Sequence, residues 1–168
     1  MAKISYSAPI QTLKRGRAMS DATNKPPVWF WILTILLLLW GMMGIYVYYD
    51  FVTSTPESMT KYVTAGTYSQ AYADYLLAQP AWATSIFALA VTSGILGAVS
   101  LVLRRTWAVP LYMLSLLCII FSLGKTFLLD KAHNLMSGGQ IGMEGVVLSL
   151  GILSVWIALK AKNNGWLN

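Results

Sequence analysis

The chain has 168 residues, of which 57% are apolar and only 11% are charged, a composition outside the range of soluble globular proteins. The net charge of +6 does not indicate nucleic-acid binding, because the basic residues lie at the borders of apolar runs rather than on one polar surface. The composition therefore favours an integral membrane protein that has the lipid bilayer as its main partner and does not bind nucleic acid.

Residues with metal-binding or catalytic chemistry are scarce. The single cysteine, Cys118, lies in an apolar run, so the chain has neither an internal disulfide nor a cluster of cysteine ligands. The single histidine, His133, lies in a polar loop, which does not suit haem ligation between helices or a structural zinc site. The sequence has no phosphate-binding glycine loop and no recognisable nucleophile motif. We therefore expect no cofactor, no metal and no enzymatic activity.

Residues 1–27 are polar and basic and show no apolar period, which predicts a flexible cytoplasmic tail. One hypothesis is that translation starts at Met19 within this tail, in which case residues 1–18 are absent from the native protein. The apolar run 28–49 that follows has no charged residue and measures about 33 Å as a helix, enough to cross the hydrocarbon core. Aromatic residues at both of its ends are typical of the two membrane interfaces.

The polar connection 50–80 is too charged to lie in the hydrocarbon, so we expect it outside the cytoplasm. The triplet Thr55-Pro56-Glu57 predicts the start of a short helix, because it offers a side-chain cap, a fixed φ and a favourable charge. Apolar and tyrosine residues then recur at spacings of three and four, which predicts an amphipathic stripe. The stripe includes Tyr68, Tyr72 and Tyr75. It either rests on the bilayer interface or caps the bundle, and the alternative is a lid that faces a ligand.

Three further spans are predicted at 82–103, 107–129 and 140–159, with a Gly138-Gly139 turn before the last. The first of the three carries a strip of small residues, which lets another helix approach closely. The strip consists of Ala90, Ser93, Gly94, Gly97 and Ala98. The predicted fold class is therefore an all-α bundle of four transmembrane helices, with a short amphipathic extracytoplasmic helix between the first two.

Basic residues are divided unevenly between the two sides of this bundle. Nine lie in the terminal segments and in the connection after the second span, whereas only Lys61 and Lys131 lie in the other two connections. The positive-inside rule therefore predicts that both termini are cytoplasmic. The residues that anchor this topology at the ends of spans are Arg104, Arg105, Lys160 and Lys162.

Two ionisable residues, Lys125 and Glu144, lie within predicted spans, where a charge is costly. Lys125 precedes the last connection and Glu144 follows it, so both lie at about 6 Å below the same surface, and we predict an ion pair between them. In the structural interpretation the pair only fixes helix register, or Lys125 reaches outward alone. In the functional interpretation the pair lines a polar cavity with His133 at its rim.

The motifs Pro80-Ala81-Trp82, Gly94-Ile95-Leu96-Gly97 and Arg104-Arg105-Thr106-Trp107-Ala108-Val109-Pro110-Leu111 resemble the DoxX-like group of small four-helix bacterial membrane proteins. The opening 25–31 and the closing 161–167 are similar to uncharacterised members sometimes labelled sugar transporters. The resemblance implies a four-helix bundle in a bacterial cytoplasmic membrane and, for a few relatives, a subunit of a quinone-linked oxidoreductase. Ala90-Val91-Thr92 stands where many members of that group carry an acidic residue.

Three functions are compatible with these features. The preferred hypothesis is a non-enzymatic accessory subunit that presents its small residues to partner helices or forms a homo-oligomer. The second is a solute carrier or ligand-binding protein with a cavity at Lys125 and Glu144. The third is the membrane subunit of a quinone-linked oxidoreductase.

Overall fold

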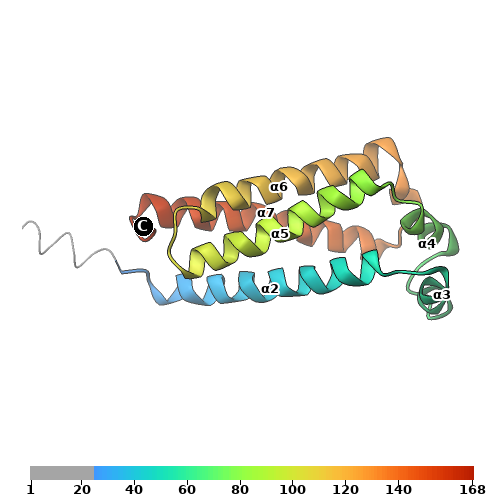
Figure 1. Cartoon of the computed structure of the whole chain (residues 1–168), viewed down its shortest axis with the longest axis horizontal. Coiled ribbons are helices and arrows are strands. Elements are labelled where there is room, and N and C mark those ends of the chain that lie inside the picture. The colour runs from blue at the N-terminus through green and yellow to red at the C-terminus, as the bar shows by residue number, and fades with distance from the viewer. Residues whose placement is uncertain (1–24) are drawn as a thin grey trace, which may run out of the picture.

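The structure, a computed structural model, describes residues 25–168, so most of the predicted tail, including Met19, lies outside the described residues. Four helices in the described part are long and apolar enough to cross a membrane (Figure 1). They are α2 (Val28–Val52), α5 (Ala81–Val102), α6 (Ala108–Gly124) with its π-helical continuation η1 (Lys125–Leu129), and α7 (Gly138–Asn163). The predicted all-α bundle with four membrane-spanning helices is confirmed.

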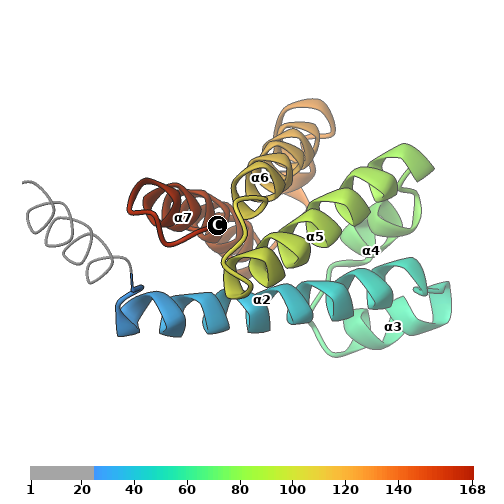
Figure 2. The same ribbon diagram turned by 60° about the vertical axis from the view of Figure 1, so that its left-hand side comes forward.

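The four long helices pack in chain order, α2 against α5, α5 against α6 and α6 against α7. Figure 2 shows the same order around the bundle, with α2 and α7 as the first and last members. The short helices α3 (Pro56–Thr64) and α4 (Gln70–Leu77) lie at one end of the bundle, and the C-terminus and the start of α2 lie at the other (Figure 1). These are called the α3/α4 end and the C-terminal end below.

The connection between α2 and α5 contains two short helices where the sequence predicts one. Helix α3 starts as predicted, because the Thr55 side chain accepts a hydrogen bond from the Ser58 amide and Ser58 caps Thr55 in return. The chain then turns at Gly66, whose φ of +73° suits glycine. Ser69 caps the second helix by accepting a hydrogen bond from the Tyr72 amide at 3.2 Å.

Two helix boundaries also differ from the predicted ones. Helix α2 continues through Asp50 to Val52, so this carboxylate belongs to the last turn of the helix rather than to the connection. Gly138 and Gly139 begin α7 instead of forming a turn, because Ser137 and Gln140 form a reciprocal capping box just before them. The cap supplies the helix start that the two glycines do not favour by themselves.

The strip of small residues on α5 faces inward and lets α6 approach closely. A Cβ atom at Gly97 would lie 3.1 Å from the ring of Tyr112, and one at Gly94 would lie 3.2 Å from the Oγ of Ser115. Ser115 in turn donates a hydrogen bond of 2.8 Å to the carbonyl of Ala90. The remaining members of the strip, Ser93 and Ala98, are buried. The strip is therefore used within the bundle.

The apolar core is concentrated at the C-terminal end of the bundle. Phe30 of α2, Leu101 of α5 and Ile157 of α7 are completely buried there. The ring of Trp166 packs edge-on against Phe30 at 5.5 Å, so the residues after α7 close this end of the bundle. The Arg104 Nε donates a hydrogen bond of 2.7 Å to the carbonyl of Trp166 and holds this segment in place.

The other predicted topology anchors lie at the same end. The Lys160 ammonium lies 5.0 Å from the ring centre of Trp29 and 4.7 Å from that of Trp156. Lys162 belongs to the last turn of α7, and Arg105 lies three residues after the end of α5.

We predict that Gly97→Val lowers the free energy of unfolding by about 2 kcal/mol, because the added side chain would collide with the Tyr112 ring. The matched control is Gly142→Val on α7, where a Cβ atom has no neighbour within 4 Å. Thermal unfolding of the two variants in a non-ionic detergent measures the difference. Equal unfolding temperatures for both variants would contradict the close contact between α5 and α6.

Candidate functional site

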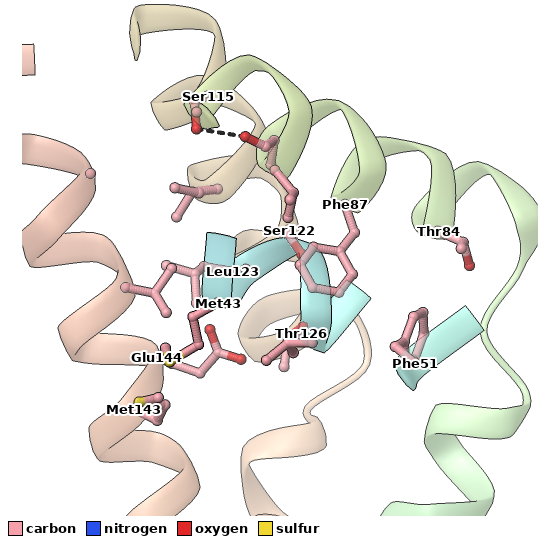
Figure 3. Close-up of a pocket in the computed structure, with 18 of the residues that line it drawn as sticks. Met43, Phe51, Thr84, Phe87, Ser115, Ser122, Leu123, Thr126, Met143 and Glu144 are labelled. Carbon is pink, nitrogen blue, oxygen red and sulfur yellow. Dashed lines mark hydrogen bonds between the residues drawn. The ribbon is translucent and has the colours of Figure 1, made fainter. Parts of the chain in front are cut away.

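A pocket of about 450 Å³ occupies the interior of the bundle towards the α3/α4 end. Its walls come from α2, α5, α6 and α7, and residues of the α3/α4 connection cover it. Figure 3 shows that most of the labelled side chains in it are apolar or carry a single hydroxyl. A volume in this range, with apolar walls and few polar groups, is typical of sites for small molecules.

Two acidic residues line the pocket. Glu144 of α7 directs its carboxylate into the pocket (Figure 3). It has no hydrogen bond and no ion pair with any of residues 25–168. Asp50 of α2 accepts a hydrogen bond of 3.2 Å from the Tyr62 hydroxyl. An intramembrane carboxylate without a partner is costly, so Glu144 is the first candidate for ligand contact.

The predicted ion pair between Lys125 and Glu144 is wrong. The ammonium of Lys125, which is largely buried, forms its ion pair with Asp130 and donates a second hydrogen bond of 2.8 Å to the side-chain oxygen of Gln79. The rings of Tyr75 and Trp82 lie 5.4 Å and 5.6 Å from the same nitrogen. Asp130 thus neutralises the charge of Lys125, and Glu144 does not take part.

The π-helix η1 explains why Lys125 meets Asp130. Residues five apart in a regular α-helix point about 140° away from each other, so this spacing does not predict contact. In η1 the Asp130 amide instead donates a hydrogen bond of 2.9 Å to the Lys125 carbonyl, five residues back, which widens the turn. The wider turn brings the two side chains to one face.

Tyr68, Tyr72 and Tyr75 all line the pocket from its α3/α4 end, so the tyrosine stripe covers this end of the bundle. Burial raises the pKa of the Tyr72 hydroxyl, and the negative charge of Glu144 raises it further, so this hydroxyl stays protonated at neutral pH. Whether the stripe also contacts the bilayer interface stays a prediction.

Hydrogen bonds join the α3/α4 cover to three different helices. The Tyr62 hydroxyl binds Asp50 of α2, and the Tyr75 hydroxyl binds Asp130 after η1 at 2.7 Å. At the start of α7, the Gln140 side chain donates to the carbonyl of Thr67 at 3.4 Å. The cover is therefore fixed on three sides of the pocket.

The side of the pocket between α2 and α7 is the least closed. These two helices do not form one of the packed pairs of the bundle, yet both contribute to the pocket wall. Met43 of α2 and Met143 of α7 line the pocket and also expose 39% and 48% of their surface. In Figure 3 both lie beside Glu144. The pocket thus faces the surroundings of the bundle at this gap, behind two flexible side chains.

His133 does not form the predicted rim of the cavity, because it is absent from the pocket wall. It lies in the short helix η2 (Ala132–Asn134), where its ring stacks on Phe127 at 5.7 Å with an interplanar angle of 1°. Its Nδ1 is buried without a hydrogen-bond partner. His133 therefore packs against Phe127 in the middle of η1 instead of forming the rim of the pocket.

Tyr112 of α6 is a pocket residue that the sequence analysis did not single out. It lines the deep part of the pocket and is 4% exposed, and its hydroxyl has no hydrogen-bond partner. A buried hydroxyl without a partner loses its hydrogen bonds to water, so this group is costly where it stands beside the pocket. Nothing in the sequence distinguishes this tyrosine from a core residue.

Groups of three or more metal-ligating side chains do not occur in the described part of the chain. The polar groups of the pocket suit hydrogen bonding and charge pairing with an organic molecule. Comparison with known proteins adds no relative to this description, since no family model, curated protein or solved structure matches the chain.

We predict that Asp130→Asn lowers the free energy of unfolding by about 2 kcal/mol, because it leaves the buried Lys125 ammonium without a counter-charge. Asp74→Asn is the matched control, since Asp74 is exposed and accepts only from Gln70 on the same helix. Hydrogen bonds from Lys125 and Tyr75 lower the pKa of Asp130. The stabilisation should therefore persist above about pH 4 and be lost as the pH falls through the lowered pKa. Thermal unfolding against pH measures both effects, and a pH-independent difference contradicts the assignment.

Proposed function

We propose that this protein is an integral membrane protein that binds a small amphipathic molecule in the pocket between α2 and α7. The observation that carries this proposal is the co-location of a 450 Å³ pocket with the Glu144 carboxylate, which has no hydrogen bond or ion pair with any of residues 25–168. Apolar walls favour a hydrocarbon or aromatic body, and the polar groups favour a ligand with at least one polar group.

The alternative of an accessory subunit ranks second. Its main support in the sequence was the strip of small residues on α5, and this strip packs against α6. A partner protein would therefore have to use another surface. A quinone-linked subunit would use the same pocket, so it differs from the proposed function only in the identity of the ligand.

The cellular setting is part of the proposal. The basic residues Arg104, Arg105, Lys160 and Lys162 favour the cytoplasmic side for the C-terminal end, so the pocket would lie nearer the opposite side of a bacterial cytoplasmic membrane. Membership of the DoxX-like group is proposed on the motif resemblance alone. Ligand binding in the pocket depends neither on this orientation in the membrane nor on membership of that group.

The orientation predicts which introduced cysteines react from outside the cell. In a Cys118→Ser background, Lys61→Cys on α3 should react with a membrane-impermeant maleimide in intact spheroplasts, whereas Lys162→Cys on α7 should react only after lysis. Labelling is read from the mass of the purified protein. The reverse pattern would overturn the orientation and leave the pocket proposal in place.

Ligand binding predicts that a side chain built into the pocket expels the bound molecule. Gly44→Leu fits this purpose, because Gly44 lines the pocket and a Cβ atom there is 3.7 Å from Val91, an ordinary contact. Native mass spectrometry of the protein from a mild detergent should show a co-purifying small molecule, with occupancy reduced at least about tenfold in this variant.

The matched control is Gly145→Leu, at an α7 position outside the pocket wall where a Cβ atom has no neighbour within 4 Å. It should retain the bound molecule at the level of the unchanged protein. A bound quinone would support the redox alternative, and a co-purifying protein in place of a small molecule would support the accessory subunit. Equal occupancy in both leucine variants would contradict binding in this pocket.

A further inference from the structure

We propose that the pocket selects a molecule with a cationic head group attached to an apolar chain, and that this molecule enters sideways between α2 and α7. The inference rests on the proposed function and adds the chemical class of the ligand. It starts from the charges that face the pocket, because a charge in an apolar site must be matched by an opposite charge.

The charged side chains that line the pocket are Asp50, Lys125 and Glu144. The Lys125 charge is already neutralised by Asp130, a residue outside the pocket wall, and its ammonium also binds Gln79. The two carboxylates have no counter-charge within residues 25–168, and Asp50 receives only the neutral hydroxyl of Tyr62. The part of the pocket near the α3/α4 end is therefore negative, which favours the binding of a cation and disfavours that of an anion.

The remaining groups define where the two parts of the ligand lie. Glu144 lies near the start of α7, the end of that helix that is at the α3/α4 end of the bundle (Figure 1). The pocket continues from there to Leu37, Tyr112 and Ser154 in the middle of the bundle. Leu123, next to Thr126, and Tyr112 are 11 residues apart on α6, which corresponds to about 16 Å of helix. A head group at Glu144 thus leaves room for a chain that extends towards Tyr112.

The route of entry follows from the closure of the two ends. The C-terminal end is filled by the apolar core, and the α3/α4 cover is hydrogen-bonded to three helices. Between α2 and α7 the pocket is bordered by the partly exposed Met43 and Met143, whose side chains have several rotatable bonds. An amphipathic molecule in the bilayer can reach Glu144 through this gap with its chain still in an apolar environment.

Three probes with the same chain and different heads test the charge selectivity. Dodecylamine, 1-dodecanol and dodecanoate are added in equal amounts to the full chain in a non-ionic detergent, and the bound fractions are read by native mass spectrometry. We expect bound dodecylamine to exceed bound dodecanol by at least about tenfold and dodecanoate to bind least. Glu144→Gln should lower the ratio of amine to alcohol at least about fivefold without lowering alcohol binding.

The control for this substitution is Glu57→Gln, an exposed acid on α3 outside the pocket wall, which should leave the ratio unchanged. If Glu144→Gln fails to fold, Asp50→Asn removes the charge of the other carboxylate in the pocket wall. The asparagine amide oxygen still accepts the Tyr62 hydrogen bond, so this contact with α3 is kept. An unchanged ratio in the folded carboxylate variant, or stronger binding of dodecanoate, overturns the inference.

The outcomes separate this inference from the proposed function. If all three probes bind equally and Gly44→Leu removes them, the pocket binds amphipathic molecules and only the cationic selectivity is wrong. If no probe binds, or if Gly44→Leu changes nothing, the proposed function fails together with the inference. For the route of entry, Met43→Trp should slow association of dodecylamine at least about fivefold. An unchanged association rate overturns entry between α2 and α7.

Discussion

The contact between Gly97 and the Tyr112 ring brings the backbone of α5 close to α6, because no Cβ atom separates the two helices there. The hydrogen bond from Ser115 to the Ala90 carbonyl continues this contact two turns away along α5. Lipid chains are as apolar as leucine, so close packing and hydrogen bonds of this kind are what hold membrane helices together. Because α5 and α6 are in close contact, no cavity separates them. The pocket lies instead on the side of this helix pair that faces α2 and α7.

Buried charge is the second constraint on the bundle. Lys125 lies near the end of a long apolar helix, and its ammonium would be costly there without partners. The π-helical turn brings Asp130 to it, α4 supplies the Tyr75 ring, and the α4/α5 connection supplies Gln79. One buried cation therefore fixes the end of α6 to the cover of the pocket. Glu144 has no such arrangement, and this contrast is the reason for assigning it to a ligand.

The sequence predicted the four long helices because an apolar run of about 20 residues has no other stable form in a bilayer. It predicted the start of α3 because Thr55 and Pro56 act locally. The partner of Lys125 was not predictable, because a regular helix separates residues 125 and 130 and the π-helix has no sequence signal of its own. The pocket itself depends on which helices pack against each other, and the sequence does not show this. From the sequence alone, Tyr112 is indistinguishable from a core residue. Its place in the pocket wall follows from the structure, in which α2 and α7 are not a packed pair.

The gap between α2 and α7 has a consequence for the affinity that the pocket needs. A site that opens to water depends on the dissolved concentration of its ligand, which is very low for a long-chain amphiphile. A site that opens beside Met43 and Met143 depends on the concentration of the same molecule in the lipid phase, where it accumulates. Modest intrinsic binding is then enough to keep the site occupied, and occupancy follows the composition of the membrane.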